Sequence, residues 1–92
     1  MQKTQKIFKS LSMKGALDVY MLIYAGCKTE YYLDFHGLIE KTKIKYNALR
    51  RITNNLSRAH LIKSIRYGTG RGRLYIVSDK DMAEKIYDFI RM

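Results

Sequence analysis

Residues 44–62 read IKYNALRRITNNLSRAHLI, and this stretch decides the fold. Apolar residues recur along it at intervals of three to five, namely at Ile44, Leu49, Ile52, Leu56 and Ala59. This spacing predicts a helix over residues 46–59 that buries one face. A second apolar pattern, which follows Asp34 as a candidate N-cap, predicts a short helix over about residues 34–42. Only a tight turn through Lys43 and Ile44 separates the two helices.

Two helices joined by so short a turn form a helix-turn-helix motif. Before it, we expect a helix over residues 13–26, with Ser12 as its N-cap and Gly26 as its stop, and then a short extended segment at residues 30–32. After it, residues 61–67 and 73–77 are rich in β-formers and flank a glycine-rich tip, which predicts a β-hairpin. A last helix follows, capped by Ser78 or Asp79.

The chain length of 92 residues fits one domain, which we place at residues 1–92. Residues 1–10 are polar and rich in lysine, so we expect a loose N-terminal arm. The longest uncharged run, residues 19–27, is far shorter than the roughly 20 residues of a membrane span. The N-terminus lacks the pattern of a signal peptide. We therefore expect a cytoplasmic protein with no membrane partner.

The positive charge is concentrated in one part of the chain. Residues 41–78 contain ten lysines and arginines and no acidic residue, whereas the flanks contain eight bases and eight acids. The flanks therefore sum to zero, and the central stretch carries the whole net charge of +10. So many like charges repel one another unless a polyanion lies opposite, which indicates a nucleic acid as the partner. An anionic membrane surface or chance is the alternative.

The order of these elements, and residues 44–62 above all, resembles the winged helix-turn-helix family of DNA-binding proteins. This resemblance covers about residues 12–92 and implies an α+β fold: a three-helix core, a two- to three-stranded antiparallel wing and a C-terminal dimerisation helix. Within the family the chain is similar to the dimeric MarR-like and ArsR-like regulators and, in size and composition, to small winged-helix proteins of archaea and their viruses. It departs from the family pattern at two positions. His60 stands where a glycine usually ends the helix, and Lys45 where a small capping hydroxyl is common.

If Leu49, Ile52 and Leu56 face the core, the opposite face of the same helix can enter the major groove of DNA. The candidates for reading bases on that face are Tyr46, Asn47, Arg50, Arg51 and Asn54. The candidates for contacting phosphates around the turn are Lys41, Lys43 and Lys45. On the wing, the candidates for contacting the minor groove or the backbone are Thr69, Arg71 and Arg73. We expect a sequence-specific regulator of transcription, with repression as the simpler mode.

A homodimer is expected because the first helix is apolar on two sides and the last helix has an apolar stripe. The candidate interface residues are Val19, Leu22, Met82, Ile86, Phe89 and Ile90. The single cysteine, Cys27, excludes an intrachain disulfide. It is either a buried thiol or half of a disulfide between subunits.

Other functions fit the sequence less well. His36 and His60 are isolated and their spacing suits no metal pair, while the carboxylates lie outside the basic stretch, so we expect no enzyme, no metal and no cofactor. No site for a small-molecule ligand is evident. The alternatives within nucleic-acid and protein binding are an architectural protein that coats DNA without reading it, and a winged-helix module that docks RNA or protein.

Overall fold

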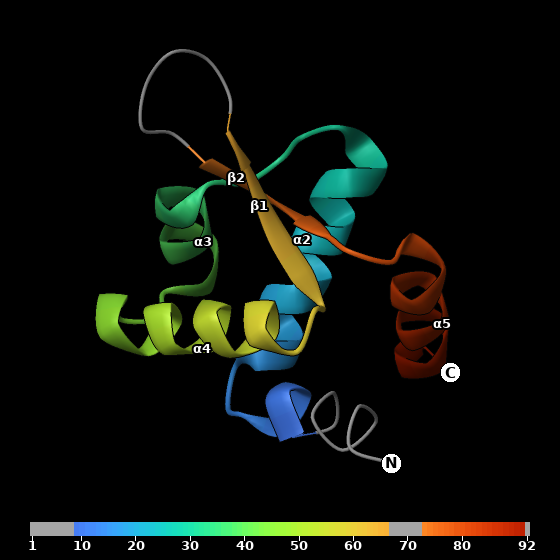
Figure 1. Cartoon of the computed structure of the whole chain (residues 1–92), viewed down its shortest axis with the longest axis horizontal. Coiled ribbons are helices and arrows are strands. Elements are labelled where there is room, and N and C mark those ends of the chain that lie inside the picture. The colour runs from blue at the N-terminus through green and yellow to red at the C-terminus, as the bar shows by residue number, and fades with distance from the viewer. Residues whose placement is uncertain (1–8, 67–72, 92) are drawn as a thin grey trace.

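The computed structural model describes residues 9–66 and 73–91. Its elements are α2 (Ala16–Thr29), α3 (Phe35–Thr42), α4 (Tyr46–Arg58), β1 (Ile62–Arg66), β2 (Arg73–Val77) and α5 (Lys80–Arg91). Residues 9–12 form a further helical turn before α2. Figure 1 shows α4 in the lower part of the molecule with the first helical turn below it, the two strands in front of α2, and α5 on the opposite side from α3. The α+β class and the predicted order of elements are confirmed.

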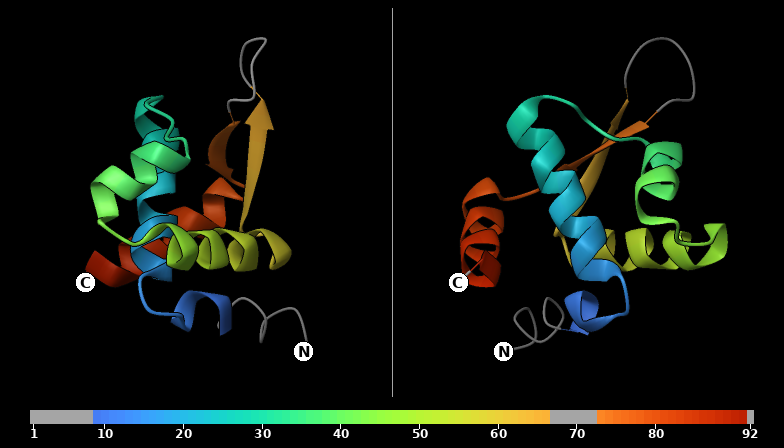
Figure 2. Two further views of the ribbon diagram at one scale, coloured as in Figure 1. Left: turned by 90° about the vertical axis from the view of Figure 1, so that its left-hand side faces the viewer. Right: turned by 180° about the vertical axis from the view of Figure 1, so that it is seen from behind.

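The core lies where α2, α3, α4 and the hairpin meet. Its largest fully buried side chains come from all four of these parts and include Tyr20, Ile23, Leu38, Leu49, Leu56 and Ile62. The two views of Figure 2 show α2 running through the middle of the molecule, with α4 across one end of it and α5 alongside. The core therefore holds α4 by one face only.

The hairpin pairs β1 with β2 in antiparallel register, from Ile62 opposite Val77 to Arg66 opposite Arg73. A single bridge extends the sheet on the other side of β2, where the Tyr75 amide donates to the Leu33 carbonyl at 3.0 Å. The segment expected to be extended, residues 30–32, is not the one that pairs. Glu30 instead adopts a left-handed conformation (φ 59°) that closes α2, so the bridge forms at Leu33.

The first helix, α2, begins and ends three residues later than the predicted range 13–26. Ser12 does not cap it, because its hydroxyl donates back to the Lys9 carbonyl at 2.8 Å within the preceding helical turn. Gly15, with φ of 84°, precedes α2. Gly26 does not stop the helix but lies inside it, where a Cβ atom would stand 2.8 Å from the Tyr31 carbonyl oxygen. The glycine is there for a close approach of backbone and not for a turn.

The last helix begins as predicted, because the Asp79 carboxylate accepts a hydrogen bond from the Met82 amide at 3.1 Å. None of the helices in the described ranges is long and apolar enough to cross a membrane. The predicted loose arm falls largely on residues 1–8, which lie outside the described residues, as does the tip of the hairpin.

Candidate nucleic-acid interface

Helix α4 separates its residues into two faces. Leu49, Ile52 and Leu56 are buried in the core, with at most 2% of each side chain exposed. The five residues proposed to read bases are all exposed on the other face: Tyr46, Asn47, Arg50, Arg51 and Asn54. The structure therefore brings these five together on one accessible surface, as the periodicity predicts.

Hydrogen bonds within α3 and the turn fix the start of α4. The Asp34 carboxylate accepts from the Gly37 amide at 2.7 Å and caps α3. Lys43 ends α3 in a left-handed conformation (φ 60°), and its amide donates to the Ile39 carbonyl at 2.8 Å. The Thr42 hydroxyl accepts from the Ile44 amide at 3.2 Å. These bonds turn the chain sharply, so that only three residues separate the end of α3 from the start of α4.

The far end of α4 stops without a glycine. His60, which stands where the family pattern has a glycine, adopts the left-handed conformation (φ 60°), and its amide donates to the Ser57 carbonyl at 3.0 Å. The Leu61 amide reaches back to the Leu56 carbonyl at 2.9 Å. This end of the helix resembles a Schellman motif. It leads directly into β1, which couples the position of the hairpin to that of α4.

The lysines proposed to contact phosphates surround the beginning of α4. Lys41, Lys43 and Lys45 are all exposed. Lys45 precedes α4 without a side-chain cap, and the first turn of α4 contains no acidic residue. The positive end of the helix dipole and three lysines thus act together, which is an arrangement that attracts anions.

The hairpin adds arginines to the same acid-free part of the chain. Arg73 is exposed, and its Nη1 donates to the Ser64 hydroxyl at 3.3 Å. Arg66, which the sequence analysis did not select, lies directly opposite Arg73 in the ladder. Two like charges in this position destabilise a hairpin unless an anion binds between them. The register of the two strands is the signal that could have identified Arg66, whereas Thr69 and Arg71 lie outside the described residues.

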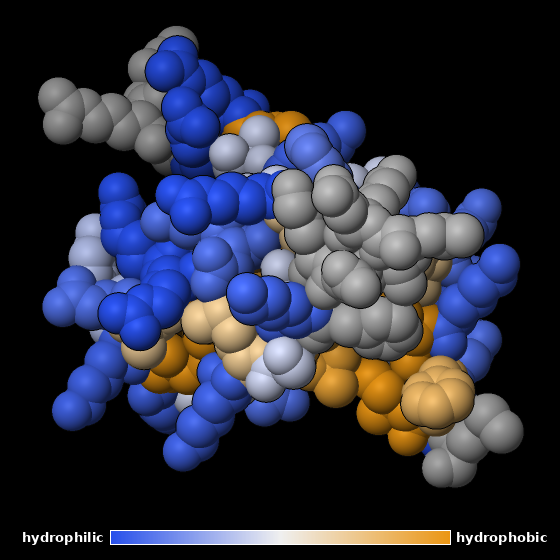
Figure 3. Space-filling model, turned by 60° about the horizontal axis from the view of Figure 1, so that its bottom comes forward, coloured by the Kyte–Doolittle hydropathy of each residue, from blue (hydrophilic) through white to orange (hydrophobic). Residues whose placement is uncertain are grey.

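The hairpin contacts α4 through β1, and Tyr75 of β2 lies near Thr53 of α4. Burial raises the pKa of the Tyr75 hydroxyl, and a hydrogen bond with Thr53 opposes this shift. Thr53 is itself buried, and its hydroxyl donates to the Arg50 carbonyl at 3.1 Å. The hairpin and α4 therefore form one continuous surface, and Figure 3 shows hydrophilic side chains gathered on the left, over α4 and the hairpin.

The candidate dimer residues divide into buried and exposed ones. Val19 is fully buried inside the single chain, so its assignment to an interface is wrong: β2, α4 and α5 already cover the second side of α2 that we expected to be free. Leu22, Met82 and Ile86 are half-buried.

The last two residues of the apolar stripe on α5 are exposed and could contact a second subunit. Phe89 is 77% exposed and Ile90 46% exposed, so α5 carries the apolar surface that a partner could cover. Figure 3 shows a hydrophobic patch toward the right-hand side of the molecule, where α5 lies.

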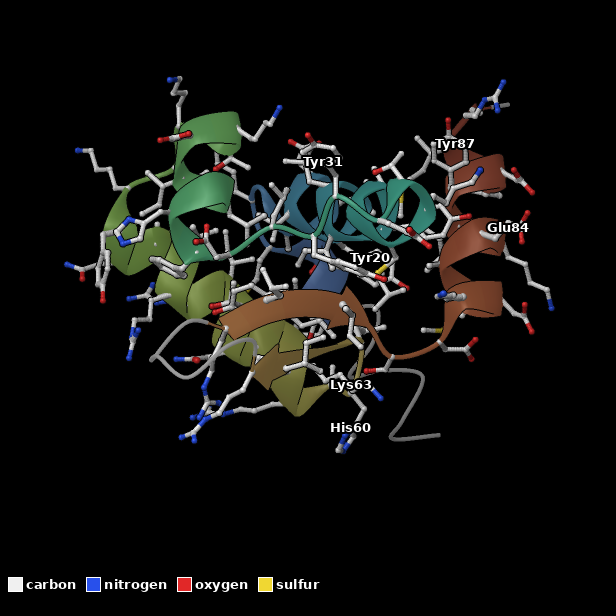
Figure 4. The ribbon with its side chains drawn as sticks, turned by 90° about the horizontal axis from the view of Figure 1, so that it is seen from above. Tyr20, Tyr31, His60, Lys63, Glu84 and Tyr87 are labelled. Atoms are coloured by element: carbon white, nitrogen blue, oxygen red, sulfur yellow. The ribbon has the colours of Figure 1, made fainter. Side chains whose placement is uncertain are left out.

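Helix α5 is held on α2 by aromatic contacts. The rings of Tyr24 and Tyr87 contact each other at a tilt of 51°, with centroids 5.9 Å apart. The Lys28 ammonium lies 5.8 Å from the first ring and 5.7 Å from the second. In Figure 4 Tyr87 lies on the side of α5 that faces α2, and Glu84 on its outer side. Cys27, on the adjoining part of α2, is a buried free thiol with 6% of its surface exposed.

A groove that the sequence did not predict lies between α2, the end of α3 and α4. It has a volume of about 820 Å³ and is lined mainly by apolar side chains of α2 and α4, among them Met21, Leu22, Ala48 and Ile52. Lys14, Asp18 and Lys41 stand among its lining residues. Histidines, cysteines and carboxylates do not gather into a metal-binding group anywhere in the described part of the chain.

Solved structures share this architecture. HlyU from Vibrio cholerae superposes with a TM-score of 0.79 at 16% identity over 99% of this chain and 95% of that one. The homodimeric winged helix-turn-helix DNA-binding domain of Mb0332 from Mycobacterium bovis, a possible ArsR-family transcriptional regulator, superposes with a TM-score of 0.78 at 16% identity, over 98% and 76%. AF1382 from Archaeoglobus fulgidus gives 0.74 at 19% identity, over 90% and 91%.

At these identities the likeness shows the fold, which is that of a winged helix-turn-helix protein. No protein-family model matches the chain. A search of curated proteins likewise finds no match.

Proposed function

We propose that this protein is a sequence-specific, double-stranded DNA-binding regulator of transcription that acts as a homodimeric repressor. One observation carries the proposal: α4 buries its apolar face in the core and presents two arginines, two asparagines and a tyrosine on the other. Similarity in fold to the DNA-binding domain of Mb0332 supports it.

Helix α4 is the segment proposed to enter the major groove, which admits an α-helix. Arginine can bond bidentately to the O6 and N7 atoms of guanine, and asparagine to the N6 and N7 atoms of adenine. Asn47, Arg50 and Arg51 lie in the first half of α4, where a recognition helix contacts base edges. Each good pair is worth about 1–3 kcal/mol of discrimination against the wrong base.

The lysines at 41, 43 and 45 are proposed to bind phosphates, together with the amino-terminal end of α4. Such contacts set the position of the protein on the duplex without reading its sequence. Arg66 and Arg73, the last pair of the ladder before the connection between the strands, are proposed to bind the adjacent backbone or minor groove. The same role is proposed for Thr69 and Arg71, which lie outside the described residues.

Titration of three variants tests this division of roles. Asn47→Ala and Arg50→Ala should weaken binding to a selected site by roughly tenfold or more and binding to random duplex much less. Lys43→Ala should weaken both alike, because it removes a contact to phosphate. A site recovered by selection from random duplex DNA supplies the cognate sequence. If all three variants lose affinity equally on both duplexes, the protein coats DNA and does not read it.

An RNA-binding function is tested by competition. The major groove of duplex RNA is too deep and narrow for side chains to read, so duplex RNA should not displace a labelled DNA site. Displacement by duplex RNA at equal concentration would favour the RNA-binding alternative.

The homodimer is proposed from the exposed apolar end of α5, where Phe89 and Ile90 are accessible. A two-fold pair would place its recognition helices about 34–36 Å apart, one turn of B-DNA. Light scattering at micromolar concentration should give twice the mass of 10.8 kDa. Phe89→Asp should shift the mass toward that of one chain, and a monomeric wild-type protein would exclude the dimer.

A further inference from the structure

Two residues on the exposed face of α4 contact each other. The Arg50 Nη1 donates to the Tyr46 hydroxyl at 3.4 Å, and the guanidinium carbon lies 5.9 Å from the centre of the Tyr46 ring. The residues are four positions apart, so their side chains are neighbours on the helix surface. A hydrogen bond and a cation–π attraction thus act on the same arginine.

Tyr46 is itself in contact with Phe35. The Phe35 and Tyr46 rings meet edge to face, with centroids 5.0 Å apart and an angle of 68° between planes. Phe35 is the first residue of α3, Tyr46 is the first residue of α4, and Phe35 packs against the core. If Tyr46 swung outward to a base, it would leave both Phe35 and Arg50.

The partner of Arg50 is neutral. Tyr46 orients Arg50 through an uncharged hydroxyl and not through an ion pair, and residues 41–78, to which both belong, contain no carboxylate. A guanidinium has five N–H donors, and a single bond to Tyr46 leaves four of them. A bidentate contact to guanine needs two.

We propose that Tyr46 is a positioning residue that sets the orientation of Arg50 for guanine recognition, with Phe35 as its support. The inference rests on the proposed function and replaces the base-reading role that the sequence predicts for Tyr46. Holding a long side chain in place before binding saves about 0.5–1.5 kcal/mol of ordering cost, which corresponds to a 2- to 12-fold change in affinity.

The first experiment tests the contact in the free protein, without DNA. Nitrogen-15 relaxation of the arginine Nε–Hε groups should show Arg50 as more ordered than Arg51, its exposed neighbour on the same helix. Tyr46→Leu, which removes both the hydroxyl and the ring, should make Arg50 as mobile as Arg51. Equal mobility of Arg50 in the wild type and in Tyr46→Leu would overturn the inference.

The second experiment is a double-mutant cycle on the selected duplex site. Tyr46→Leu should weaken binding about 2- to 12-fold when Arg50 is present and should have no further effect in an Arg50→Ala background. Asn54→Ala supplies the matched control background, in which the full loss should persist. If the loss also persists in Arg50→Ala, Tyr46 acts on the DNA directly and the inference is wrong.

Tyr46→Phe keeps the ring against Phe35 and removes only the hydroxyl, so it repeats the cycle should Tyr46→Leu unfold more readily. It should give a smaller loss that again disappears in Arg50→Ala. Failure of the proposed function would appear separately, as a wild-type protein that prefers no duplex sequence. The relaxation measurement would still decide whether Tyr46 orders Arg50.

Discussion

Tyr20 is a buried residue whose hydroxyl lacks a hydrogen-bond partner within the described part of the chain. It lies in the middle of the molecule, between α2 and β2 (Figure 4). Leaving a buried hydroxyl unpaired costs about 1–3 kcal/mol. We therefore expect Tyr20→Phe, which keeps the ring and removes the oxygen, to raise the free energy of unfolding by about 1 kcal/mol in urea titrations. A loss of more than about 1 kcal/mol would mean that the hydroxyl has a partner.

Because Tyr20 is buried, we also expect the free energy of unfolding to depend on pH in the alkaline range. Burial, and then the negative charge of Asp79, raise the pKa of Tyr20 from 10.0 to about 12. The folded chain thus favours the neutral phenol, so this contribution to stability is complete below about pH 10 and is lost as the pH rises toward 12. Tyr20→Phe should remove this part of the pH slope. Tyr31→Phe, at a side chain that is 82% exposed, should leave the slope unchanged.

Gly26 reverses the usual effect of placing alanine in a helix. Replacing an exposed glycine in a helix interior by alanine usually raises the free energy of unfolding by about 1 kcal/mol. At Gly26 the added methyl group would stand 2.8 Å from the Tyr31 carbonyl oxygen, which is backbone and cannot move aside easily. We expect Gly26→Ala to lower the free energy of unfolding by about 1–3 kcal/mol. Stabilisation of this variant in urea would show that the loop after α2 yields without cost.

Among the elements, those with local signals were predictable from the sequence. Helices α3, α4 and α5 and the hairpin follow from apolar periodicity and from the caps at Asp34 and Asp79. These features depend on residues within a few positions of one another. The exposed face of α4 follows from the same periodicity, so the five candidate residues could be selected without a structure.

Helix α2 was misplaced because long-range contacts determine its ends and its environment. The packing of the Tyr31 carbonyl on Gly26 lets α2 continue to Thr29, and a glycine in sequence looks the same whether it ends a helix or admits a neighbour. The burial of Val19 likewise depends on which elements cover α2. The pairing of Arg66 with Arg73 could be known only from the strand register, and the edge-to-face contact of Tyr46 with Phe35 only from the placement of two helices.

The capping of α3 gives a prediction at the scale of one element. Asp34→Ala removes the acceptor that the Gly37 amide contacts at 2.7 Å. It should lower the free energy of unfolding by about 1 kcal/mol. Asp34→Asn keeps an acceptor oxygen and should cost much less. Equal losses in the two variants, measured in urea, would show that the charge of Asp34 matters more than its cap.

On the scale of the whole molecule, the acid-free basic stretch and the exposed apolar residues Phe89 and Ile90 lie on different elements. Helix α4 and the hairpin carry the basic residues, and α5 carries the exposed Phe89 and Ile90 (Figures 1 and 3). A dimer formed through α5 would therefore leave the exposed face of α4 free in both subunits. The net charge of the flanks is zero, so the attraction to a polyanion comes from one region of the chain.

This uneven distribution predicts how salt acts on DNA binding. For duplex DNA the logarithm of the binding constant falls linearly with the logarithm of salt concentration, by about 0.9 for each phosphate neutralised. Lys43→Ala, at the start of α4, should reduce this slope by about one for each bound subunit. Lys85→Ala removes the same charge from an exposed position on α5 and should leave the slope unchanged. If the two variants reduce the slope equally in titrations between 50 and 200 mM salt, the net charge and not its position drives binding. The proposal that lysines around the start of α4 contact phosphates would then be wrong.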